Sequence, residues 1–252
     1  MKLLLRQRVV IAAALGGIVA LAWLYLFITA ADMRTSMAGM DRYMAMPPKG
    51  AVDLLLLIAM WWVMMVGMML PSAAPMILTF ASVNRNRRTR GEPYVPTALF
   101  AAGYLLVWGG FSIAATLAQW ALEGATLLSP MDMTIDSRLL GGLLFLAAGL
   151  YQFTPVKLAC LRFCRSPFDF VLNHWRNGSG GALRMGVTHG LYCLGCCWIL
   201  MLLLFVSGVM NLLWVAGLSA VVLVEKLVVG PWIGRIGGVL LGACGVWLLV
   251  MA

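Results

Sequence analysis

Long uninterrupted apolar runs constrain this chain more than any other feature of its sequence. A helix needs about 20 apolar residues to cross a bilayer, and the runs have this length. They are apolar on every side rather than alternating with polar residues, which predicts helices and argues against a membrane barrel of strands. We expect an all-α, polytopic bundle that forms one integral membrane domain over residues 1–252. Its seven expected spans are 9–30, 51–70, 96–118, 138–156, 184–207, 210–229 and 233–251.

The charge distribution predicts a topology rather than a ligand. The chain is 63% hydrophobic and only 11% charged, which excludes a nucleic-acid-binding domain despite the net charge of +9. Most Lys and Arg residues lie at the N-terminus, in the last loop, and in loops 84–95 and 157–184. Cytoplasmic loops carry such an excess, so we expect the N-terminus inside and the C-terminus outside in a bacterial inner membrane. The run from Val9 to Ala31 is too long for a signal peptide and predicts an uncleaved anchor.

Several local features predict irregularities in the bundle. Pro71 and Pro75 should bend the chain near the inner face, with residues 76–83 along the interface. Residues 207–209 predict a tight turn between two spans, with Asn211 as the helix cap, or else a re-entrant pair. Small residues follow at i, i+4 in the last span, which indicates close helix packing either within the monomer or in an oligomer; they are Gly234, Gly238 and Gly242.

Methionines gather in the outer loop 31–50, which is otherwise polar. Thioethers are soft ligands that suit Cu(I), so we expect this loop to capture the metal; the alternative is that these side chains contact lipid at the interface. The residues are Met33, Met37, Met40, Met44 and Met46. The outer segment 129–133 repeats the pattern with two further methionines.

A second group of methionines lies within the second span, at helical spacing. Met60, Met64 and Met68 fall on one line of the helix, with Met65 and Met69 on the adjacent line. Flexible apolar packing explains any one of them. As a set that starts from the methionine-rich side, they predict a path for the metal into the membrane.

Cysteines supply the most specific pattern. Cys160 and Cys164 form a C-x3-C motif after the fourth span. The fifth span carries H-x3-C-x2-C-C, which places four potential soft ligands on one helix face: His189, Cys193, Cys196 and Cys197. We expect a metal site for Cu(I), with zinc as another possibility. A thiol–disulfide redox site and simple packing are the alternatives. Cys244, alone in the last span, is assigned to packing.

Few other polar groups lie in the apolar runs. Glu225 and Lys226 close the sixth span, where they predict an ion pair with Lys157 or Arg235, or a functional site. Tyr151-Gln152 and Thr154-Pro155 could supply hydrogen bonds at a helix break. The sequence shows no Walker loop, G-x-S-x-G motif or phosphorylated-aspartate motif, so we expect neither an enzyme nor a pump that works alone.

Five segments together form a recognisable combination: 68–72, 151–157, 160–167, 190–198 and 225–226. They resemble the bacterial family described as predicted metal-binding integral membrane proteins, sometimes labelled copper chaperones. The resemblance runs from about Met60 to Lys226, and the paired cysteine motifs are its most specific part. It implies metal binding and a link to copper. His189 is not expected to belong to the family's motif.

The sequence therefore predicts an inner-membrane protein that handles Cu(I) as a chaperone, a transporter or an accessory subunit for a copper enzyme. Its expected partners are the bilayer and a membrane or periplasmic copper protein, with possible oligomers through the last span. A membrane thiol oxidoreductase and a structural subunit of a larger complex are the competing hypotheses. In the preferred one, the outer methionines and the line on the second span pass the ion to the fifth-span cysteines, and Cys160 and Cys164 form the inner docking pair.

Overall fold

The fold is helical throughout the described residues of the computed structural model, which are 2–36, 50–88, 95–128, 134–135, 137–228 and 230–251. One isolated antiparallel bridge joins Leu128 and Ile135. The all-α prediction is confirmed. The helices are α1 (Lys2–Ser36), α2 (Ala51–Arg88), α3 (Thr97–Gly124), α4 (Arg138–Tyr151), α5 (Pro155–Arg165), α6 (Pro167–His174), α7 (Gly178–Leu202), α8 (Leu204–Ser207), α9 (Leu212–Leu227) and α10 (Trp232–Val250).

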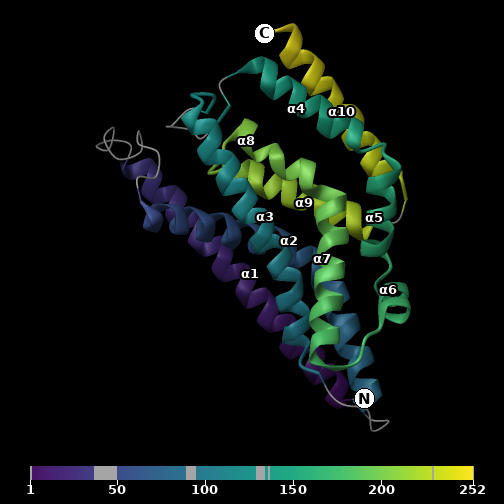
Figure 1. The fold of residues 1–252 in the computed structure, drawn as a ribbon. Coiled ribbons are helices and arrows are strands. Elements are labelled where there is room, and N and C mark those ends of the chain that lie inside the picture. The colour runs from purple at the N-terminus through teal and green to yellow at the C-terminus, as the bar shows by residue number, and fades with distance from the viewer. Residues whose placement is uncertain are drawn as a thin grey trace.

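The helices long enough to cross a membrane are fewer than the seven expected. The described residues contain five such helices, or six if α4 and α5, which meet at a 63° bend, form one broken span. The expected sixth span corresponds to α9, which has only 16 residues. A helix of that length covers about 24 Å, less than the about 30 Å of a hydrocarbon core. The two termini lie at opposite ends of the molecule (Figure 1), and the orientation in a membrane stays a prediction.

The second helix continues through its prolines: α2 runs from Ala51 to Arg88. The expected position of residues 76–83 along the membrane interface stays a prediction. Pro71 has no N–H to donate to the carbonyl oxygen of Gly67, four residues earlier. The indole Nε1 of Trp23 in α1 donates to this oxygen instead, at 3.3 Å. A neighbouring helix therefore replaces the missing bond, which is how proline is tolerated inside membrane helices.

The fourth span breaks where hydrogen-bonding residues were expected. Thr154 caps α5 by accepting a hydrogen bond from the backbone N–H of Lys157 at 3.3 Å, and Pro155 occupies the first helical position. The hydroxyl of Tyr151 donates to the carbonyl oxygen of Gly195 in α7. The break thus turns α5 and its cysteines toward α7.

The turn between α8 and α9 also agrees with its prediction. Gly208 has φ +88°, a conformation that glycine adopts without strain. The side chain of Asn211 accepts a hydrogen bond from the backbone N–H of Trp214 and caps α9.

Glycines bring two helix pairs into close contact. A Cβ atom on Gly103 of α3 would lie 2.2 Å from the carbonyl oxygen of Leu183 in α7, and one on Gly186 would lie 2.0 Å from that of Phe100. In the second pair, a Cβ on Gly238 of α10 would lie 3.0 Å from the carbonyl oxygen of Gly149 in α4. The glycine face of the last span therefore packs within the monomer.

Figure 1 shows how these contacts arrange the molecule. Helices α1, α2, α3 and α7 lie together, while α4 and α10 form a separate pair joined to them through α5, which packs on α7. Helix α9 packs against α2. Helices α2, α3, α7 and α9 thus surround a common interior, which is where the candidate site lies.

Candidate metal site

The methionines of α2 point into the protein. Met60 is 7% exposed, and the side chains of Met64, Met65, Met68 and Met69 are 1% exposed or less. Thioethers that face lipid or solvent could not pass an ion among themselves. Burial of all five is compatible with a path for the metal and equally with core packing, so the path stays a prediction.

The cysteines of α7 face the same interior. Cys193, Cys196 and Cys197 are buried, with exposures of 1%, 2% and 1%. The thiols of Cys196 and Cys197 each donate a hydrogen bond of 3.0 Å to the carbonyl oxygen of Cys193. Both hydrogen bonds follow from the spacing, because Cys196 and Cys197 come three and four residues after Cys193 and so lie one helical turn further along α7.

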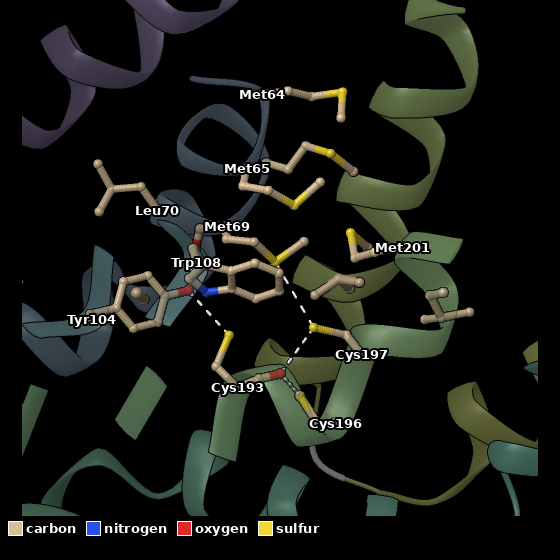
Figure 2. Packing of buried hydrophobic residues seen from close by; sticks show 14 of the residues in the cluster. Met64, Met65, Met69, Leu70, Tyr104, Trp108, Cys193, Cys196, Cys197 and Met201 are labelled. Carbon is tan, nitrogen blue, oxygen red and sulfur yellow. Dashed lines mark hydrogen bonds between the residues drawn. The ribbon is translucent and has the colours of Figure 1, made fainter. Parts of the chain in front are cut away.

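The methionine line and the cysteine turn meet at one contact. The Sγ atom of Cys197 lies 4.0 Å from the Sδ atom of Met69. Figure 2 shows the thioethers of Met64, Met65, Met69 and Met201 gathered on one side of this contact, and Cys193 and Cys196 on the other. The residue that reaches the cysteines is thus Met69 from the adjacent line, rather than Met68.

Cys193 has two further polar neighbours from other helices. The hydroxyl of Tyr104 in α3 lies 3.1 Å from its Sγ atom, and that hydroxyl also donates to the carbonyl oxygen of Met69 at 3.1 Å. The Nζ atom of Lys226 in α9 donates to the same sulfur at 2.9 Å, and to the Oγ atom of Ser72 at 2.9 Å. Helices α2, α3, α7 and α9 therefore all contribute to the surroundings of this thiol.

The cysteines of α5 extend the group of thiols. Cys164 is buried on α5, which packs on α7. Cys160 is half-buried and packs on Gly195 of α7, where an added Cβ would lie 2.7 Å from its sulfur. The structure thus brings the two cysteine motifs of the sequence together.

The remaining predicted residues have other surroundings. His189 is buried, stacks on Phe100 and Tyr104 with ring centroids 6.1 and 5.5 Å away, and has no hydrogen-bond partner for its Nδ1 atom in the structure. Cys244 is exposed on α10. The outer-loop residues Met37, Met40, Met44 and Met46 lie outside the described residues, as do Met131 and Met133; Met33 belongs to α1, but its side chain is not described.

A buried ion pair lies close to the cysteines along α9. Lys157 Nζ is 2.7 Å from Glu225 Oε2, and the two side chains are 1% and 2% exposed. The pair that the sequence suggested therefore forms with Lys157, in the interior. Lys157 also donates to Gln152 Oε1. Lys226, the neighbour of Glu225, is the residue that contacts Cys193.

The potential metal ligands of this region are the sulfur atoms of buried cysteines and methionines. Among the described residues, no group of three or more His, Cys, Asp and Glu side chains is arranged to hold a metal ion. Among these residues, the Cys197 thiol contacts the thioether of Met69 and the backbone carbonyl oxygen of Cys193. Zinc sites are almost always four-coordinate, whereas thiolates and thioethers are the ligands that Cu(I) prefers.

Sequence reasoning did not identify four residues of this site by their roles. Tyr104 carries no motif that marks it, because only the packing of α3 on α7 brings it to Cys193. Ser72 belongs to segment 68–72 of the family resemblance, but its contact with Lys226 was not predicted. Lys226 could be noticed in the sequence as a charge inside an apolar run, but its contact with a thiol could not be predicted. Met69 was recognised only as a member of the second methionine line.

The fold and the site define a class: an all-helical protein with several helices long and apolar enough to span a membrane, built around a buried group of cysteine and methionine sulfurs. A model of the family described as PpoB2, copper chaperone, matches residues 58–248. The match covers most of the chain, so the chain belongs to this family of copper chaperones, as its resemblance to such proteins indicated. No curated protein and no solved structure matches the chain.

Proposed function

We propose that this protein carries Cu(I) within the bacterial inner membrane and binds it between Cys193, Cys197 and Met69. The observation that carries the proposal is the contact of Cys197 with Met69, which joins the thiols of α7 to a buried line of thioethers on α2. The copper chaperone family to which the chain belongs supports copper as the cargo.

The chemistry of the three donors supports this choice. Thiolates and thioethers are soft ligands that select Cu(I) and bind hard cations poorly. The three sulfurs come from two helices, and their side chains are at most 1% exposed, so water does not compete with them. Binding replaces the thiol protons, which leave to solvent, because cysteine coordinates metal as the thiolate.

The other sulfurs supply a route on either side of this position. On one side lie the buried thioethers of Met65, Met64 and Met60 on α2. On the other lie the buried thiols of Cys196 and Cys164, followed by the half-buried Cys160. In this proposal the ion moves by exchange between neighbouring sulfurs, and the methionine-rich loop 31–50 serves the outer end.

The recipient would be a membrane or periplasmic copper protein, because a chaperone delivers its ion to another site. Handover by ligand exchange needs a donor that a partner can reach. Cys160 is the only cysteine of the group in α5 and α7 that is not fully buried, so we assign it to the inner docking point.

The test is the copper content of detergent-purified protein after loading with Cu(I) under reducing conditions, measured by mass spectrometry. The double variant Cys193→Ser/Cys197→Ser should lose the bound copper. Met69→Leu, which keeps an apolar side chain of similar size, should weaken binding by about tenfold without unfolding the protein. Cys244→Ser is the matched control, because this cysteine is exposed on α10 and should leave the copper content unchanged.

Copper retained by the double variant would contradict the proposal, and so would the absence of copper from the wild-type protein. In the second case, alkylation of the cysteines through a redox cycle would show whether a pair alternates between dithiol and disulfide. That result would favour the membrane thiol oxidoreductase instead.

A further inference from the structure

The buried ammonium group of Lys226 is the feature that the copper site alone does not explain. Lys226 is 6% exposed, and its Nζ atom donates to Cys193 Sγ and to Ser72 Oγ, both at 2.9 Å. An intramembrane ionisable residue is costly and is retained for a function or a partner. A neutral side chain could donate a hydrogen bond to the thiol at a lower cost in free energy than a buried lysine.

No carboxylate neutralises this charge within the described part of the chain. The adjacent Glu225 is already paired with Lys157, at 2.7 Å. The ionisable side chain that the Nζ atom of Lys226 contacts is the thiol of Cys193, at 2.9 Å. Lys157 and Glu225 cancel each other, so one positive charge is left beside the sulfurs.

Charge balance then distinguishes metals by valence. Cu(I) held by two thiolates and a neutral thioether forms a unit of charge −1, and Lys226 brings the whole to zero. A divalent ion on the same ligands forms a neutral unit, and with Lys226 the interior carries +1. A net charge in a low-dielectric interior is strongly unfavourable.

We propose that Lys226 makes the sulfur site selective for a monovalent ion over a divalent one. This inference rests on the proposed function, since it assumes that Cys193 and Cys197 bind the metal. Lys226 is a positioning and selectivity residue in this view, because it acts through the charge of Cys193 and does not coordinate the ion. The same charge balance disfavours zinc, the other metal considered for this site.

The experiment compares Cu(I) with Cd²⁺, because both are soft ions and differ in charge. The dissociation constants of both are measured on the purified full-length protein at one pH, by competition with chelators. Lys226→Met removes the charge and keeps the length of the side chain. Ser72→Asp places a carboxylate next to Lys226 and neutralises it without removing it, which provides a second route if Lys226→Met does not fold.

Both variants should shift the preference for Cu(I) over Cd²⁺ toward Cd²⁺ by at least about tenfold, the size expected when a unit charge near the ion is cancelled. Lys226→Arg keeps the charge, and Ser72→Ala removes only a neutral hydrogen-bond partner; both should stay within about threefold of wild type. An unchanged preference in Lys226→Met and Ser72→Asp would overturn the inference. If Cys193→Ser/Cys197→Ser binds Cu(I) as wild type does, the proposed function fails instead, so the two failures are distinguishable.

Discussion

The ion pair between Lys157 and Glu225 joins two buried charged residues. Both side chains are almost fully buried, and their charged atoms lie 2.7 Å apart. The attraction offsets the cost of taking both groups out of water, and removing one partner leaves the other as an uncompensated charge. The pair links α5 to α9, and through α9 it fixes the position of Lys226 at Cys193.

We therefore expect Glu225→Ala to destabilise the protein by about 3–5 kcal/mol, the usual cost of an unpaired buried charge. The double variant Lys157→Met/Glu225→Leu should recover most of this loss, because it leaves no buried charge behind. Equilibrium unfolding in mixed detergent micelles measures both. If the double variant lost as much unfolding free energy as Lys157→Met and Glu225→Leu lose together, the interaction between the two side chains would not be the source of the stability.

Some contacts of these residues could be predicted from the sequence, and others could not. The sequence predicted an ion pair of Glu225 and Lys226 with Lys157 or Arg235, and in the structure it forms between Glu225 and Lys157. The predicted cap at Asn211 is confirmed. The contact between Lys226 and Cys193 could not be predicted, because two adjacent residues of a helix point in different directions. Which of them faces α7 depends on the rotation of α9 in the packed molecule.

At the scale of helices, glycines set the distance between α3 and α7. These two helices hold the tyrosine and the cysteines of the site. A Cβ atom on Gly103 would lie 2.2 Å from a backbone oxygen of α7. Backbone atoms cannot move aside as the end of a flexible side chain can, so any larger residue must push the helices apart.

Gly103→Ala should therefore cost about 1–3 kcal/mol of stability, as overpacking usually does, and should lower Cu(I) affinity by moving Tyr104 away from Cys193. Gly110→Ala on the same helix is the control, because an added Cβ there meets nothing within 4 Å. It should be neutral or stabilising, since alanine favours helix. Unfolding and copper titration of both variants test this; equal effects of the two would contradict the packing argument.

The prolines of α2 show how a neighbouring helix changes the effect of a residue inside an element. Each proline removes one hydrogen bond of the helix. Trp23 of a different helix donates to the freed carbonyl oxygen of Gly67. The sequence contains both residues but not their proximity, so this hydrogen bond could not be predicted from it.

At the scale of the whole molecule, composition predicted the class and not the number of spans. Apolar runs indicate helices in lipid whatever their neighbours are, and the all-α fold is confirmed. The run at 210–229 folds as the short helix α9, which packs against α2. Hydropathy does not distinguish such a helix from a full span, because a helix inside a protein and one in lipid are equally apolar.

The candidate site was also predicted only in part: its residue types were, and the contacts between them were not. The sequence identified the cysteines of α5 and α7 and the methionines of α2 as soft ligands, because their spacing places them on single helix faces. The contacts of Cys197 with Met69, and of Cys160 with Gly195, depend on how the helices pack. Tertiary contacts therefore turn separate motifs into one continuous group of sulfurs.

The central claim is that copper is held by sulfur alone, between α7 and α2. X-ray absorption at the copper edge, recorded on the full-length protein loaded with one equivalent of Cu(I), tests it most directly. The account predicts a first coordination shell of sulfur atoms only, which is lost in Cys193→Ser/Cys197→Ser. A shell that contains nitrogen or oxygen, or a sulfur shell that persists in this double variant, would contradict it.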